Sequence, residues 1–175
     1  MAGLTHMYYG NGKGKTTAAL GLALRAAGSG QNVVIIQFLK DWNVSELKSL
    51  ELIPNIQVFR GKASGGTFLK DMTQEQLADT KSIHDDNLKN ALELQAKGEC
   101  DMLVLDEAID AYRLDVLDKE LFENLLDNKP SELELVITGH RPPRNLLGKA
   151  DYVTEMVKHK HPYDEGVKAR RGVEF

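Results

Sequence analysis

The sequence predicts an α/β fold with a mainly parallel sheet flanked by helices. Apolar runs alternate along the chain with segments of helical pattern, and these runs begin at Thr5, Val33, Ile56, Met102 and Leu133. The run 33–38 is apolar almost throughout instead of alternating, which is typical of a strand buried on both faces of a parallel sheet. A glycine-rich stretch at 10–17 separates the first run from the first helical segment, as a strand-turn-helix unit requires.

Length and composition limit the class of protein. The 175 residues fit one domain with a sizeable core, and we take 1–175 as that domain. A hydrophobic content of 42% is that of a soluble globular protein, and no apolar run approaches the roughly 18 residues that span a bilayer. Without an export signal at the start, and with one cysteine, we expect a cytoplasmic protein that has no membrane partner. The net charge of −4 argues against a dedicated nucleic-acid binder.

The stretch 10–17 has the composition of a phosphate-binding loop. Its glycines allow φ > 0 and bring successive N–H groups toward one anion, and the helix that follows points its positive end there. We expect the nucleotide to be held by Gly10, Asn11, Gly12, Lys13, Gly14, Lys15, Thr16 and Thr17. Lys15 would reach the outer phosphates, and the Thr16 hydroxyl would bind Mg²⁺. The alternative is an ordinary glycine-rich turn that caps a helix.

The loop departs from the usual phosphate-loop spacing at its first position. The pattern Gly-x-x-x-x-Gly-Lys-Thr asks for glycine where this chain has Tyr9. We therefore expect the ring of backbone amides to close through Gly10 and Gly12. The apolar run 5–9 before the loop predicts a strand, and the alanine- and leucine-rich segment 18–27 after it predicts a helix.

The next elements continue the alternation. We expect a strand at 33–38, a short helix at 45–50 and a strand at 56–59. Lys40 follows the strand at 33–38, at the edge where open α/β sheets bind ligands, so we expect it to contact nucleotide, the alternative being a solvated lysine. The segment 60–70 is too glycine-rich for regular structure and reads as a mobile loop over the site, or as a plain connector.

The middle of the chain carries the second chemical motif. A capping box at 73–76 opens a long helix that ends before Gly98. Cys100 is expected to be a buried core residue.

The strand that follows, 101–105, places Asp106 and Glu107 at its carboxyl end, and this pattern resembles a Walker B segment. Hard cations need anionic oxygen, so we expect Mg²⁺ to be held there by Thr16, Asp106 and Glu107. The alternative is a strand end with two solvated acids.

The last third predicts a helix at 117–126, a strand at 133–138, a short helix at 145–150 and a strand at 152–156. His140 and Arg141 follow the strand at 133–138 and could bind phosphate from its tip, although a solvated loop is the alternative. The basic tail 158–175 could bind an anion, but the spacing of His159 and His161 does not specify a metal site.

Four stretches together resemble the P-loop type corrinoid adenosyltransferases, the ATP:cob(I)alamin enzymes, over nearly the whole chain. These stretches are 10–20, 34–40, 105–107 and the closing segment 154–175. The resemblance implies a single P-loop (RecA-like) domain, and the family shares the variant loop. Two positions depart from it. The family usually has arginine where this chain has His140, and its aromatic pair in the mid-chain loop is reduced here to Phe68.

The resemblance implies transfer of the 5′-deoxyadenosyl group of ATP to the Co(I) centre of a reduced corrinoid, with release of triphosphate, in adenosylcobalamin synthesis or salvage. Lys15, Thr16 and Glu107 would carry the reaction, with Mg²⁺ (or Mn²⁺) assisting, and Phe68 would contact the corrinoid. Because the chain has no flavin or iron–sulfur motif of its own, a reduced flavoprotein or similar donor would make Co(I). A homodimer is the family's expectation.

Two other classes of function remain open from the residues alone. A P-loop ATPase or small-molecule kinase would use the same loop to break the β–γ bond, with Glu107 positioning water, and the motifs by themselves slightly favour this. A non-catalytic, ATP-dependent switch or corrinoid-binding protein would bind ATP without turnover. The products separate the three: triphosphate, ADP or neither.

Overall fold

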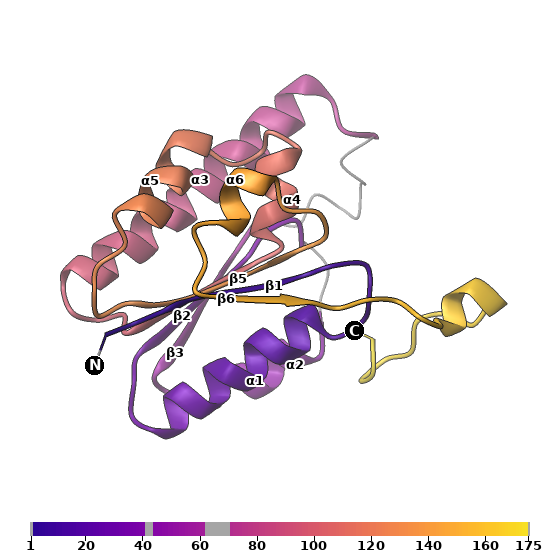
Figure 1. The fold of residues 1–175 in the computed structure, drawn as a ribbon, viewed down its shortest axis with the longest axis horizontal. Coiled ribbons are helices and arrows are strands. Elements are labelled where there is room, and N and C mark those ends of the chain that lie inside the picture. The colour runs from indigo at the N-terminus through magenta and orange to yellow at the C-terminus, as the bar shows by residue number, and fades with distance from the viewer. Residues whose placement is uncertain (1, 41–43, 62–70, 175) are drawn as a thin grey trace.

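The computed structural model describes residues 2–40, 44–61 and 71–174, and its centre is a parallel sheet (Figure 1). The sheet order is β3-β2-β4-β5-β1-β6, and each neighbouring pair is parallel. The strands are β1 (Thr5–Tyr9), β2 (Val33–Gln37), β3 (Ile56–Arg60), β4 (Met102–Asp106), β5 (Glu134–Gly139) and β6 (Tyr152–Glu155). The predicted α/β fold with a mainly parallel sheet is confirmed.

Helices cover both faces of the sheet (Figure 1). One face carries α1 (Lys15–Gly28) and α2 (Glu46–Leu50). The other face carries α3 (Gln74–Ala96), α4 (Ala108–Arg113), α5 (Lys119–Asp127) and α6 (Arg144–Leu147). Within the described residues, no helix is long and apolar enough to cross a membrane.

The apolar strands explain why both faces are covered. Alternate residues of β2 belong to different cores: Val33 and Ile35 pack with the α1 side, whereas Val34 and Ile36 pack with the α3 and α5 side. Since successive side chains point to opposite faces, an unbroken apolar run needs a helical layer on each. On its inner side α1 presents small residues, which let the helix lie close to the sheet; they are Ala19, Ala23, Ala26 and Ala27.

Helix boundaries follow the capping residues. The predicted capping box is present at the start of α3, where Thr73 Oγ1 accepts from the Gln76 amide and the Gln76 side chain accepts from the Thr73 amide. The helix expected at 117–126 begins two residues later, because the Asp118 side chain accepts from the Leu121 amide and caps α5. The sequence interpretation did not include α4.

The C-terminal segment leaves the sheet and returns to the loop after β1 (Figure 1). All four residues of β6, the edge strand, are exposed. Beyond a 3₁₀ turn at Pro162–Glu165, the chain comes back so that Lys13 Nζ donates to Val173 O at 3.3 Å. Nearer β6, the Lys158 amide donates to Asn11 Oδ1 at 2.9 Å. The tail is thus attached to the loop by polar contacts.

Candidate active site

The sheet topology gathers the predicted site residues at one edge. The carboxyl ends of parallel strands meet there, so the loop after β1, the segment after β2 and the acids that end β4 approach one another. Strand β5 lies between β1 and β4, and its end therefore contributes Thr138 and His140 to the middle of the site. For this reason residues more than 100 positions apart, such as Gly10 and His140, are hydrogen-bonded to each other.

The glycines of the loop serve two different purposes. Gly10 and Gly14 have φ of 114° and 112°, the left-handed region that only glycine adopts readily. Gly12 does not have a positive φ in the structure. It is needed for space, because a Cβ there would lie 2.7 Å from the carbonyl oxygen of Met156. The expectation that all the loop glycines supply φ > 0 is therefore corrected for Gly12.

Two backbone amides of the loop, which we expected to bind the anion, bond to other parts of the chain instead. The Gly10 amide donates to His140 O at 3.1 Å and the Gly12 amide donates to Met156 O at 2.6 Å. These bonds extend the contacts of β1 with β5 and β6, so the amide ring is not closed through Gly10 and Gly12. Gly14 is the N-cap of α1 and has no side chain to accept from the first-turn N–H groups, which leaves those groups for an anion.

Lys15 and Thr16 open α1 beside the acids of β4. Lys15 is buried, and its Nζ donates to the carbonyl of Gly12 at 2.9 Å. This hydrogen bond keeps the lysine side chain against the glycine-rich loop. Thr16 Oγ1 donates to Asp106 Oδ1 at 2.8 Å. The phosphate loop and the carboxylate of β4 are therefore in direct contact, as the metal prediction requires.

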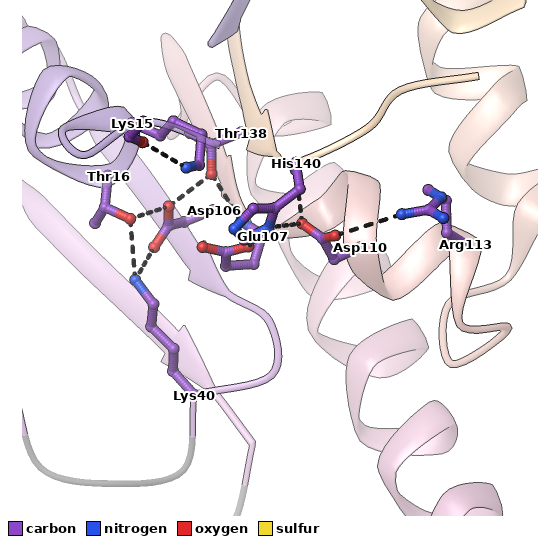
Figure 2. Close-up of polar contacts among 10 residues, drawn as sticks. Lys15, Thr16, Lys40, Asp106, Glu107, Asp110, Arg113, Thr138 and His140 are labelled. Carbon is purple, nitrogen blue, oxygen red and sulfur yellow. Dashed lines mark hydrogen bonds and ion pairs between the residues drawn. The ribbon is translucent and has the colours of Figure 1, made fainter. Parts of the chain in front are cut away.

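Asp106 is the centre of the first polar network of the site (Figure 2). Its side chain is 0% exposed. Oδ1 accepts from the hydroxyl groups of Thr16 and Thr138, the latter at 2.7 Å, and Oδ2 lies 2.5 Å from Nζ of Lys40. The Lys40 ammonium also donates to Thr16 Oγ1 at 3.1 Å. Lys40 thus reaches the site, where it contacts protein oxygens.

Glu107 belongs to a second network (Figure 2). This residue has φ of 63°, and its amide donates to Thr138 Oγ1 at 2.8 Å. Its Oε2 lies 3.7 Å from His140 Nδ1, which in turn lies 3.0 Å from Asp110 Oδ2. The His140 amide donates to the same Asp110 oxygen at 2.9 Å. Ligand atoms of Glu107, Asp110 and His140 all lie within 4.8 Å of one another, so this trio could also hold a metal ion.

The second network shifts the pKa values of its members. Burial raises the pKa of Glu107 to about 7, and the hydrogen bond to Asp110 and the charge of Asp106 act in the same direction. Burial opposes ionisation of Asp110 as well, but hydrogen bonds from His140 and Glu107 outweigh it and lower the pKa of Asp110. The hydrogen bond to Asp110 raises the pKa of His140. Glu107 therefore retains a proton more readily than an ordinary carboxyl.

The two networks lie beside a cavity of about 740 Å³, the size of a nucleotide or cofactor pocket, although Asp106, Asp110 and Thr138 do not line it. Its walls include most predicted residues, namely Asn11, Gly12, Lys13, Gly14, Lys15, Thr16, Thr17, Lys40, Glu107 and His140. The tail adds Gly172, Val173 and Glu174. Arg141 is exposed and does not border this cavity, and Gly10 is buried and does not border it either. Phe68 and most of the loop expected at 60–70 lie outside the described residues.

Two functional positions escaped the sequence interpretation. Asp110 lies three residues after Glu107, a spacing that would place both on one helical face, but the short α4 was not recognised. Thr138 was considered only as a strand end, although the hydroxyl of a threonine at the carboxyl edge of a parallel strand is a possible site group. The burial of Cys100, by contrast, was expected, and it raises the pKa of that thiol to about 12.

A glycine-rich loop at the start of α1, in contact with a buried aspartate at the end of β4, defines a P-loop nucleotide-binding protein. Comparison with known proteins narrows the class. The family model described as ATP:corrinoid adenosyltransferase BtuR/CobO/CobP matches residues 1–175. The chain therefore belongs to the ATP:corrinoid adenosyltransferase family, which confirms the resemblance drawn from its motifs.

Individual relatives agree with this assignment. The corrinoid adenosyltransferase of Escherichia coli K12 is 36% identical over 174 residues, 99% of this chain and 86% of that protein. The corrinoid adenosyltransferase CobA of Salmonella typhimurium is 37% identical, with the same coverage. Among solved structures, the ADP form of the Aeropyrum pernix ORC2 protein has a TM-score of 0.40 and 16% identity, covering 91% of this chain and 43% of that one. A likeness of that size carries no argument about this chain.

Proposed function

We propose that this protein transfers the 5′-deoxyadenosyl group of ATP to the Co(I) centre of a reduced corrinoid and releases triphosphate. The observation that carries the proposal is the match of the whole chain to the adenosyltransferase family, together with a phosphate loop that meets Asp106 beside a cavity of nucleotide size. An ATPase or kinase would share the loop, but neither would account for the family match.

The reaction makes limited demands on the protein. Co(I) supplies the electron pair that forms the cobalt–carbon bond, and the C5′–oxygen bond breaks with its electron pair going to the triphosphate. No general base is needed. The protein has to align cobalt with C5′ and stabilise the charge that develops on the leaving group. Lys13, Lys15 and the first-turn amides of α1 suit that second task because all of them border the cavity.

The oxygen donors of the first network fit Mg²⁺ (or Mn²⁺). The hydroxyl of Thr16 and the carboxylate of Asp106 are hard ligands that already lie 2.8 Å apart, and Glu107 follows directly in the chain. When bound, the ion would neutralise charge on the triphosphate. Thr16, Asp106 and Glu107 would hold it, and His140 takes the position where the family usually has arginine and would face the nucleotide.

The remaining roles are also proposals. We assign nucleotide contacts to residues 11–17 of the loop and to Lys40, and we leave out Arg141 because it does not border the cavity. We keep Phe68 as the corrinoid contact. The chain would act as one domain, 1–175, in the cytoplasm. A reduced flavoprotein or similar donor would supply Co(I), and a homodimer would be the assembly.

Analysis of the products tests the function directly. ATP labelled in its phosphates would be mixed with chemically reduced corrinoid, Mg²⁺ and the protein, and the phosphates would be separated by anion exchange. We expect an adenosylated corrinoid and an equal amount of intact triphosphate, with no ADP. A reaction without corrinoid is the control. ADP and orthophosphate that form regardless of corrinoid would return the chain to the ATPase class, and no turnover would leave a binding protein.

A further inference from the structure

Lys40 takes the position that the nucleotide's metal ion would need. Its Nζ lies 2.5 Å from Asp106 Oδ2 and 3.1 Å from Thr16 Oγ1. These oxygens belong to two of the three groups that would bind Mg²⁺ in the proposed function. Figure 2 shows the lysine reaching these oxygens from the segment after β2. A side-chain cation therefore contacts the first network in this structure.

The surroundings of Asp106 explain why a cation is required there. The carboxylate is 0% exposed and the Lys40 side chain is 14% exposed, so water contributes little to their solvation. The hydroxyls of Thr16 and Thr138 both donate to Oδ1, which leaves Oδ2 to the ammonium. A buried carboxylate without a positive partner is strongly unfavourable. An ammonium and a divalent ion on the same oxygen would repel each other, because little solvent lies between them.

We propose that Lys40 keeps the metal position closed until nucleotide arrives, so that Mg²⁺ enters with ATP and does not bind beforehand. This inference rests on the proposed function for the identity of the metal ligands. Lys40 borders the same cavity as Lys13 and Lys15, so the phosphates give the displaced ammonium a new anionic partner. The metal ion takes over the charge of Asp106 at the same step. Lys40 is thus a positioning residue that sets the order of binding.

The consequence is measurable without any reaction. Removing the Lys40 charge opens a metal site on Asp106 in the absence of nucleotide. Glu107, Asp110 and His140 form a separate donor set that could also take a metal ion, so the experiment has to distinguish the two sites. Asp106→Asn disables the first site, and Asp110→Asn disables the second.

The test is titration of the nucleotide-free protein with Mn²⁺, with the free ion followed by electron paramagnetic resonance. For Lys40→Met we expect one site that binds Mn²⁺ at least about tenfold more tightly than wild type, because a like charge has been removed at close range. This gain is lost in the double variant with Asp106→Asn and kept in the one with Asp110→Asn. Lys149→Met is the matched control, since it removes a lysine that lies 2.5 Å from the more exposed Asp127 and leaves Mn²⁺ binding unchanged.

Two outcomes overturn the inference: no gain in Lys40→Met, or a gain that survives Asp106→Asn. If Lys40→Met does not fold, Lys40→Gln decides the question, because its amide still donates to Asp106 without a charge, and the same gain is expected. The readout contains neither ATP nor corrinoid. Failure of adenosyl transfer in the wild type would therefore count against the proposed function alone, and an unchanged Mn²⁺ affinity would count against the role of Lys40 alone.

Discussion

Asp106 and Glu107 are consecutive residues, yet they belong to two networks with different sets of charged groups. Asp106 completes β4 and is compensated by the Lys40 ammonium and two hydroxyls. Glu107 has a left-handed backbone, and its side chain lies beside the carboxylate of Asp110 and 3.7 Å from the His140 ring. The same Asp110 carboxylate is also paired with His140 at 3.0 Å and with Arg113 at 4.0 Å. In the first network the Lys40 ammonium faces the carboxylate directly, whereas in the second network burial raises the pKa of Glu107 to about 7 and favours its protonated form.

The comparison shows that two members of the proposed metal set have different surroundings. Asp106 is paired with the Lys40 ammonium. Glu107 has a raised pKa, so it competes for a proton more strongly than an ordinary carboxyl. We therefore expect substitutions at these two positions to separate stability from catalysis at neutral pH, where Asp106 should matter for both and Glu107 mainly for catalysis.

The largest expected effect comes from the loop that faces both networks. Lys15→Ala should lower the rate of adenosyl transfer by about 10³-fold, because it removes a charge placed at the leaving triphosphate. Within the described residues, its ammonium is held by one hydrogen bond, to the Gly12 carbonyl, so the thermal midpoint should stay within about 4 °C of wild type. Steady-state kinetics and calorimetry measure the two quantities. A large loss of stability would instead make Lys15 a structural residue of the loop.

Asp106→Ala should produce the largest loss of stability. The substitution leaves the partly buried Lys40 ammonium and two hydroxyls without their acceptor, which costs about 3–5 kcal/mol in the free energy of unfolding. Urea unfolding measures this. Asp127→Ala is the matched control, because Asp127 is paired with Lys149 at the surface and its removal should cost less than about 1 kcal/mol. Equal costs at the two positions would mean that the first network is not a buried one.

Glu107→Ala should be smaller in effect and confined to catalysis. We expect a loss of about 10²-fold in rate, with unfolding at neutral pH little changed, since the substitution also removes a carboxyl crowded against Asp110. Part of the rate should return at high Mg²⁺ or Mn²⁺ concentration if the missing group was a metal ligand. A rate that stays low at every metal concentration would argue that Glu107 acts in another way.

The sequence was informative wherever periodicity or a capping residue determined the structure. The unbroken apolar run of β2 and the Thr73 capping box predicted elements that the structure contains. The short α4 was missed because six residues give too little periodicity to detect, and Asp110 was missed with it.

The contacts within the site could be predicted only in part. Strand ends indicated that Thr16 and Asp106 would meet, because parallel strands share their carboxyl edge. Nothing local indicated that Lys40 would bind Asp106, or that Gly12 is required by the carbonyl of Met156. Those contacts join residues 66 and 144 positions apart, and they depend on the order of strands in the sheet and on the path of the tail.

The smallest expected effect is the pH dependence of stability that the second network creates. The folded pKa of Glu107 is raised to about 7, so its stabilising contribution is complete below the ordinary carboxyl range and is lost as the pH rises through 7. The raised pKa of His140 acts in the same direction. The lowered pKa of Asp110 matters only at acid pH, where its contribution is lost as the pH falls. Between pH 5 and 8, the free energy of unfolding of the nucleotide-free protein should therefore decrease by about 2 kcal/mol.

Glu107→Gln, which cannot titrate, should flatten much of this slope in urea unfolding at pH 5, 6, 7 and 8. Glu165→Gln, which changes an exposed carboxyl of the tail, should leave the slope as it is. If the Glu107 variant kept the full slope, the proton would not reside on Glu107, and the contrast between the two networks would have to be assigned to His140.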